Sequence, residues 1–198
     1  MGRTKAFNPE QVLNQALMLF WQQGYQATSV ADLEKHLGIN KFSLYNTFGN
    51  KHSLYLQALD LYIEQRFTPL FSMLANHQMG LEAISHFFNA LNLGLSNQLN
   101  NEGCFVASAG VELSASDNEV RKRVQGVYGQ LEDGFYACLE SAQQQGKLEA
   151  TLSLQELARF FLVQSQGMLT VARNQQSART VTSSTEFLNT LLLLLKTK

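Results

Sequence analysis

The chain has 198 residues, of which 45% are hydrophobic and 16% are charged, and its net charge is −1. This composition supports a substantial apolar core and excludes a chain that is disordered over most of its length. The overall charge gives no general signature of nucleic-acid binding. Residues 1–51 carry five Lys and Arg against three Asp and Glu, so this end is net +2 and the remainder is net −3. That asymmetry has the sign expected of an N-terminal end that faces DNA.

The two cysteines, Cys104 and Cys138, lie far apart, so neither a zinc site nor a disulfide framework is expected. The four histidines show no metal-ligand spacing with an acid or a thiol. The first residues lack the apolar stretch of a signal peptide, and the longest purely apolar run covers only residues 191–195. We therefore expect a cytoplasmic protein with reduced thiols, no cofactor, no bound metal and no membrane partner.

Three short helices are predicted at the N-terminus. Asn8 and Pro9 form a helix start, and Gly24 ends that helix. A second helix follows Thr28-Ser29 and ends at Gly38, which favours a left-handed stop. Asn40 caps a third helix that breaks at residues 49–50. The short lengths and the tight turn at residues 37–40 are typical of a helix-turn-helix unit.

The third helix is too short and too polar to be a core helix. Ile39, Leu44 and Phe48 can face inward, which leaves Lys41, Ser43, Tyr45 and Thr47 on the outer side. A helix that lies in a DNA groove needs such an outer face. The alternative is an ordinary three-helix core with a solvated face.

The remaining chain also reads as helices. A fourth helix runs from about residue 51 to 67, and Pro69 ends or kinks it. Further helices are expected near 70–77, 81–99, 104–114, 117–145, 153–173 and 183–196, with polar breaks at 97–103 and 175–184. Gly126, Gly129 and Gly134 weaken the case for an unbroken helix over 117–145. The expected fold is all-α, with a helix-turn-helix domain over residues 1–50 and a helical domain over residues 51–198, linked through helix 51–67.

The run from Gly38 to Lys51 resembles the recognition segment of the TetR family of transcriptional regulators. In that family a glycine turn leads to Leu-Tyr, then to an aromatic residue and a lysine, as Leu44-Tyr45, Phe48 and Lys51 do here. The resemblance implies a DNA-binding regulator that responds to a ligand in its C-terminal domain. It implies DNA contacts by these residues: Thr28, Ser29, Asn40, Lys41, Phe42, Ser43, Tyr45, Asn46, Thr47 and Lys51.

Within that set, the resemblance assigns Thr28, Ser29, Tyr45 and Lys51 to phosphates, and places Asn40, Lys41 and Ser43 on the groove side. Two positions depart from the family. Thr47 stands where Tyr or His is common, and Phe42 stands where a small residue is common, so base preference stays open. Arg3 and Lys5 form either an arm along the DNA or a simple basic start of the chain.

The last two helices are candidates for a homodimer surface, because one helix-turn-helix unit reads few base pairs and such proteins pair to read two half-sites. Their apolar residues exceed what one neighbour in a monomer covers. The alternative is ordinary core. The candidate residues are Leu157, Phe161, Met168, Phe187, Leu188, Leu191, Leu192 and Leu195.

A ligand pocket is expected in the C-terminal domain, lined mostly by aromatic side chains, each of which has a core position as its alternative. The candidate lining residues are Phe87, Phe88, Cys104, Phe105, Tyr128, Phe135, Tyr136, Phe160 and Gln164. Cys104 follows Gly103 at a predicted helix start, where the helix dipole lowers a thiol pKa. A similar start occurs in NemR-like members of the family, which respond to electrophiles and oxidants. The alternative is a buried, inert cysteine.

The expected function is that of a repressor released from a palindromic operator by a small-molecule or electrophile inducer. Activation instead of repression stays open. Two other classes are a helical enzyme and a purely structural dimer. An enzyme would need a nucleophile with a positioned base, and the sequence suggests none; the retained Tyr45 and Lys51 speak against a structural dimer.

Overall fold

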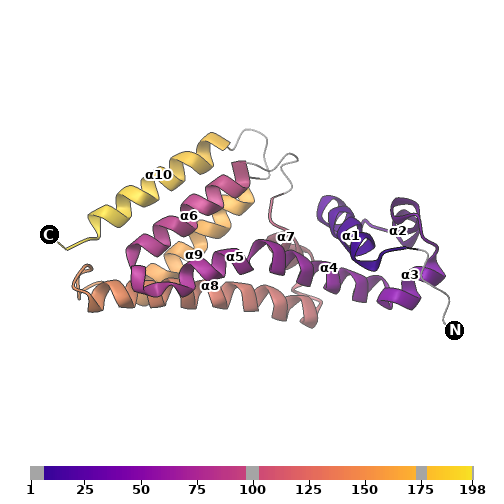
Figure 1. The fold of residues 1–198 in the computed structure, drawn as a ribbon, viewed down its shortest axis with the longest axis horizontal. Helices are drawn as coiled ribbons and strands as arrows, with labels where there is room; N and C mark the ends of the chain where they lie inside the picture. The colour runs from indigo at the N-terminus through magenta and orange to yellow at the C-terminus, as the bar shows by residue number, and fades with distance from the viewer. Residues whose placement is uncertain (1–6, 97–102, 173–177, 198) are drawn as a thin grey trace.

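The computed structural model describes residues 7–96, 103–172 and 178–197, and these residues form α-helices with no β-strand (Figure 1). The all-α prediction is therefore confirmed. Arg3 and Lys5 lie outside the described residues. In chain order the helices are α1 (Pro9–Gln23), α2 (Val30–Leu37), α3 (Lys41–Phe48), α4 (Lys51–Arg66), α5 (Thr68–Ala75), the 3₁₀ turn η1 (His77–Met79), α6 (Leu81–Ser96), α7 (Phe105–Leu113), α8 (Asn118–Gln144), α9 (Leu154–Val171) and α10 (Ala178–Leu194).

Local capping chemistry sets the ends of the first four helices. The side chain of Asn8 accepts hydrogen bonds from two backbone N–H groups of α1. Ser29 and Asp32 form a reciprocal capping box at the start of α2, and Gly38 ends α2 with φ of 67°. Asn50 caps α4 by accepting from the N–H of Ser53. These groups satisfy N–H donors that a helix leaves unpaired, so the predicted boundaries are confirmed here.

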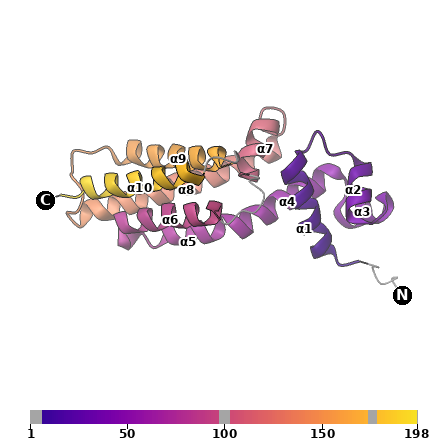
Figure 2. The same cartoon turned by 90° about the horizontal axis from the view of Figure 1, so that it is seen from above.

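The molecule is elongated, with α1, α2 and α3 at one end and α5, α6, α8, α9 and α10 at the other (Figures 1 and 2). Helix α4 runs from the first group into the second and packs against α1 on one side and α5, α7 and α8 on the other. The two parts are therefore joined through a shared helix, with no linker between them.

Aromatic rings fill the interior of both parts. Phe87, Phe88, Phe135 and Phe161 pack on one another between α6, α8 and α9, with ring centroids 4.9–5.8 Å apart. A second series joins α1, α4 and α7, in which Tyr55 contacts Phe105 at 5.4 Å. Edge-to-face contacts at such separations stabilise a core beyond simple burial.

Helix α8 continues unbroken through all three of its glycines. At Gly134 a Cβ would lie 2.9 Å from the Cβ of Leu74 on α5, so glycine permits the two helices to approach closely. The missing side chain of Gly134 thus permits close packing of α8 against α5.

The start of α10 differs from the prediction. Residues 178–184 were expected to be a polar break, yet the helix begins at Ala178. Val181 and Thr185 are buried there, and the hydroxyl of Thr182 donates to Asn92 on α6 at 3.3 Å. Contacts with a neighbouring helix thus outweigh the weak helix propensity of this segment.

Candidate nucleic-acid interface

The outer face of α3 is the candidate surface for DNA. Leu44 and Phe48 are buried against the other N-terminal helices, which fixes the opposite side of α3 toward solvent. Phe42 is 82% exposed, so most of its ring faces solvent. Lys41 and Asn46 are exposed beside it, and Ser43 and Thr47 are partly exposed. The structure therefore brings most of the predicted groove-facing residues onto one surface.

Two side chains occupy the N-terminus of α3. Asn40 Oδ1 accepts a hydrogen bond from the N–H of Ser43 at 2.8 Å. The Glu34 carboxylate on α2 accepts one from the N–H of Lys41. The predicted cap at Asn40 is confirmed, but sequence reasoning missed Glu34. Since both groups compensate unpaired N–H donors, the helix start is held rigidly against α2.

Of the two hydroxyls at the start of α2, only Ser29 is accessible. Ser29 lies on the surface, where it also bonds Asp32 at 2.6 Å. Thr28 is 0% exposed, and its hydroxyl donates to the carbonyl of Gly24 at 2.6 Å. The predicted phosphate contact by the Thr28 side chain is therefore wrong, because that group supports the turn after α1.

Lys51 lies at the first position of α4, and its Nζ lies 4.2 Å from the centroid of the Tyr25 ring. Partial burial lowers the pKa of Lys51, although Glu112 and Asp32 act in the opposite direction. Tyr45 is half-buried, with Lys41 Nζ 5.5 Å from its ring. The ammonium groups of both lysines thus lie over aromatic rings, and the attraction between cation and ring favours these positions.

Three polar contacts tie the N-terminal helices and α4 to α7 and α8, and none has a local sequence signal. The Glu112 carboxylate on α7 accepts from the N–H of Tyr25 at 3.0 Å and of Gln26 at 2.7 Å. His52 on α4 is hydrogen-bonded to Asp117, the N-cap of α8.

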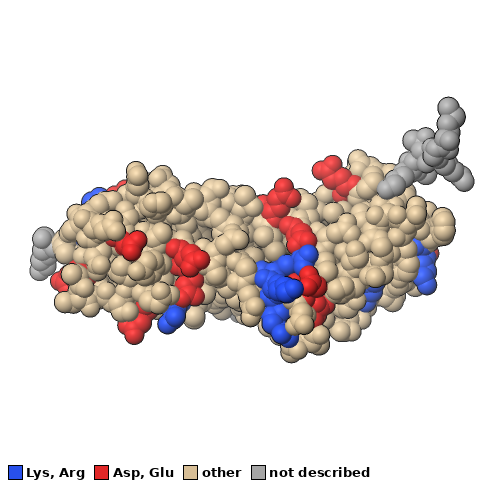
Figure 3. Space-filling model, turned by 90° about the horizontal axis from the view of Figure 1, so that it is seen from below, with Lys and Arg blue, Asp and Glu red and all other residues tan. Residues whose placement is uncertain are grey.

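The third contact is the pair of bonds from Arg123 on α8 to the Asp60 carboxylate on α4, at 2.6 and 3.0 Å. One face of the molecule carries basic and acidic side chains side by side near its middle, with further charged side chains of both signs toward its ends (Figure 3). Charges of both signs thus lie together there, and that face presents no single basic patch.

Four aromatic residues of the predicted pocket lie in the packed core. Phe87, Phe88, Phe105 and Phe135 are at most 1% exposed and belong to the packed core. Phe160 and Gln164 line a surface groove between α9 and α10 instead. Tyr128 is half-buried, and burial raises its pKa; Tyr136 is also half-buried against the core.

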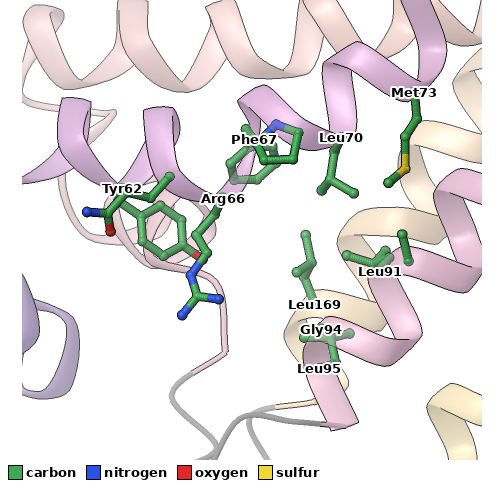
Figure 4. A pocket seen from close by; sticks show the side chains of 12 residues that line it. Tyr62, Arg66, Phe67, Leu70, Met73, Leu91, Gly94, Leu95 and Leu169 are labelled. Carbon is green, nitrogen blue, oxygen red and sulfur yellow. The ribbon is translucent and has the colours of Figure 1, made fainter. Parts of the chain in front are cut away.

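A cavity of about 230 Å³ lies elsewhere, between the end of α4, α5, α6 and the end of α9. Figure 4 shows side chains from these helices around one open space, with Arg66 reaching down from α4 beside Tyr62. The described residues that line it are Tyr62, Gln65, Arg66, Phe67, Pro69, Leu70, Met73, Ala90, Leu91, Gly94, Leu95 and Leu169. Such concave, mostly apolar sites are where small molecules bind.

Cys104 stands at the N-cap of α7, as predicted, and its Sγ accepts from the N–H of Ala107 at 3.4 Å. The predicted lowering of its pKa is wrong. Burial raises the pKa of the Cys104 thiol, and hydrogen bonds from Ala107 and Tyr62 offset this only in part. A raised pKa disfavours the reactive thiolate form. Burial also raises the pKa of Cys138, to about 12.

The candidate dimer residues divide into two groups. Phe161, Met168, Leu188 and Leu192 are buried within the subunit, so the prediction that they lie at a dimer surface is wrong. Leu157, Leu191 and Leu195 are half-buried, and Phe187 is 67% exposed. Helices α9 and α10 expose further apolar side chains: Phe160, Val163, Leu193 and Leu194.

Within the described ranges, His, Cys, Asp and Glu form no group of three or more that could hold a metal ion. Among the helices that the structure describes, none is long and apolar enough to cross a membrane.

Comparison with known proteins agrees with this arrangement. The family model "Bacterial regulatory proteins, tetR family" matches residues 12–58, and "Tetracyclin repressor-like, C-terminal domain" matches residues 80–188. The HTH-type transcriptional regulator YezE of Bacillus subtilis is 34% identical over 161 residues, which cover 81% of this chain and 83% of YezE. The HTH-type transcriptional repressor ComR of Escherichia coli is 29% identical, covering 89% and 84%.

A solved structure of the regulator CifR, a cysteine mutant complexed with a 26-base-pair operator, superposes with a TM-score of 0.80 at 24% identity, covering 94% of this chain and 97% of that one. At this sequence identity, the superposition shows that the two proteins share a fold. The matches to both family models and to YezE show more: the chain belongs to the TetR family of DNA-binding transcriptional regulators.

Proposed function

We propose that this protein is a homodimeric repressor that is released from a palindromic operator when a small molecule occupies its C-terminal domain. The observation that carries the proposal is the outer face of α3, where the 82% exposed Phe42 stands among polar side chains while Leu44 and Phe48 anchor the opposite side. A surface of this kind suits base edges, and the Phe42 ring suits a thymine methyl group. Catalysis forms no part of the proposed function.

The proposed DNA contacts follow from the exposed positions. Lys41, Phe42, Ser43 and Asn46 face the bases, with Asn40 and Thr47 at the edges of the same surface. Ser29, Tyr45 and Lys51 meet phosphates, as hydroxyls and cations do in protein–DNA complexes. CifR, of the same fold, is bound to operator DNA in its structure, and ComR is named a repressor. These likenesses support repression at an operator in the cytoplasm.

The proposed dimer uses the exposed apolar side chains of α9 and α10, among them Phe187, Phe160 and Val163. Several exposed apolar side chains on two neighbouring helices are typical of an interface. Two-fold pairing would place two α3 helices on successive turns of the major groove, so the half-sites would lie about one helical turn apart. The proposed division of each subunit is residues 1–50 for DNA and 51–198 for dimerisation and ligand binding.

Selection of bound sequences from random duplex DNA with the purified full-length protein tests the proposal. We expect a palindrome whose half-sites are separated by about one helical turn, or 10–10.5 base pairs. A variant with Phe42→Ala and Asn46→Ala should lose the enrichment while it keeps its helical content. Failure of the wild-type protein to enrich any sequence would contradict the proposal.

A further inference from the structure

The cavity between α4, α5, α6 and α9 has one charged side chain, the exposed Arg66, at its open side. Leu70, Met73, Leu91 and Leu169 give it an apolar lining, and Arg66 is the one charged residue among the described residues that line it. No Asp or Glu lies within ion-pair distance of Arg66 in the part of the chain that the structure describes. A guanidinium without a carboxylate partner beside an apolar space can bind an anionic group of a ligand.

The volume of about 230 Å³ suits a small ligand. At the roughly 30 Å³ that one water occupies in the liquid, it corresponds to about eight waters, or to a ligand of about eight to ten non-hydrogen atoms. The apolar lining suits a short aliphatic or aromatic body, and the planar guanidinium suits the two oxygens of a carboxylate.

Arg66 also touches the DNA-reading part. Its Cζ lies 5.9 Å from the ring centroid of Trp21 on α1, which is the only tryptophan in the chain. The same ring packs edge-to-face on Tyr62, another residue that lines the cavity, at 5.0 Å. Movement of Arg66 toward a ligand would therefore change the surroundings of Trp21.

We propose that this cavity takes a small apolar monocarboxylate, that Arg66 holds the carboxylate, and that Trp21 reports its arrival to α1. Binding of the ligand needs no DNA and can be tested by itself. Only the statement that the ligand regulates DNA binding rests on the proposed function.

Titration of the full-length protein with hexanoate, octanoate, benzoate and phenylacetate, read by Trp21 fluorescence, tests the proposal. The primary amides of the same four acids are matched in shape and lack the charge. At least one acid should change the emission and bind about tenfold more tightly than its amide. Equal binding of acids and amides, or no response to any of the four acids, would overturn the proposal.

Three variants sharpen the result. Arg66→Gln should bring the affinity for the acid down to that for the amide. Arg159→Gln, at an exposed pair with Glu132, should leave the preference intact. Gly94→Leu should abolish binding of both compounds. Gly94 lines the cavity and a Cβ built there meets no atom within 4 Å, so the leucine side chain would occupy the space that the ligand needs. An acid preference that survives Arg66→Gln would also overturn the proposal.

Operator affinity measured without any ligand keeps the two proposals separate. If the protein binds its selected operator and no acid alters Trp21 emission, only the ligand proposal fails. If acids bind and no operator can be selected, only the proposed function fails.

Discussion

The carboxylate of Glu112 and the backbone of Tyr25 join the two parts of the molecule across 87 positions of sequence. Oε2 accepts from the Tyr25 N–H, and Oε1 accepts from the N–H of Gln26 at 2.7 Å. The backbone can lie this close to the Glu112 carboxylate because residue 24 is glycine. Its φ is +84°, and a Cβ at this position would lie only 3.0 Å from Oε2 of Glu112. One side chain of α7 thus holds the turn that connects α1 to α2.

Replacing Glu112 by Ala should lower the free energy of unfolding by about 1–2 kcal/mol, because two N–H donors lose their acceptor. In a chain of this size that corresponds to a fall in Tm of about 2–8 °C. Thermal denaturation followed by circular dichroism measures it. Glu140→Ala, at an exposed position of α8, is the control and should leave Tm unchanged. Equal Tm values for both variants would remove the assigned role.

Asp117 should make stability depend on pH at the acid side. Partial burial alone would raise its pKa, but hydrogen bonds from the N–H of Val120 and from His52 outweigh burial and hold the pKa below 3.8. A lowered pKa in the folded state stabilises the fold above the unfolded-state value and loses that effect as pH falls through the folded-state value.

The variant Asp117→Asn keeps a residue that caps helices well and removes only the charge. Its Tm should be a few degrees below that of the wild type near neutral pH, with the gap closing as pH falls below about 3.8. A gap that stays constant from pH 7 to pH 3 would show that the charge contributes nothing. Thermal denaturation across that range gives the answer.

Lys51→Ala should weaken binding to all duplexes about equally and reduce the slope of log affinity against log salt by about one unit. The reason is that a lost phosphate contact releases one counterion fewer and carries no base information. Fluorescence anisotropy at several salt concentrations measures the slope. Lys147→Ala, in the turn after α8, should keep the wild-type slope. An unchanged slope in Lys51→Ala would exclude this lysine as a phosphate contact.

Replacement by alanine should change the stability of the fold in opposite directions at two glycines of α8. At Gly134 the new Cβ would lie 2.9 Å from that of Leu74, so overpacking should destabilise the fold by about 1–3 kcal/mol. At Gly126 a Cβ meets nothing within 4 Å, and the same change should stabilise the helix by about 0.5–1 kcal/mol. Urea denaturation of both variants compares them. A loss of stability at both positions would mean that the close approach of α5 is not the cause.

Phe187→Glu should convert the proposed dimer into monomers, because it replaces an exposed ring of the proposed interface on α9 and α10 with a charge. Light scattering coupled to size-exclusion chromatography gives the mass directly. Val111→Glu, at a 91% exposed position of α7, places the same charge on another apolar surface residue and should leave the dimer intact. A Phe187→Glu protein that stays dimeric would assign the interface elsewhere.

The sequence predicted the helices whose ends depend on neighbouring residues. Asn8, Ser29 with Asp32, Asn40 and Asn50 cap helices within three residues of themselves, so their effect is visible in the sequence. The first turns of α10 were missed because distant partners stabilise them, among them Asn92, which lies 90 positions from Thr182. Local preference carries no information about such partners.

The candidate site also has features that the sequence predicted and features that it did not. The exposed face of α3 follows from helical periodicity, since buried Leu44 and Phe48 define its opposite side. Periodicity does not reveal whether a buried aromatic face meets a ligand or another helix, and Phe87 and Phe135 proved to meet each other at 4.9 Å. Glu112 showed no signal at all, because its acceptor role depends on a turn formed far away in the chain.

The single helix α4 would act as a lever arm if it tilted as one body. Its 16 residues span about 24 Å, with Lys51 at the proposed DNA-binding end and Arg66 at the cavity end. If the cavity end served as the fulcrum, a tilt of about 5° would sweep Lys51 through about 2 Å. Hydrogen bonds tolerate displacements of only a few tenths of an ångström. A rotation of α4 alone would thus break its hydrogen bond to α8, between His52 and Asp117, together with any contact of Lys51 with a phosphate.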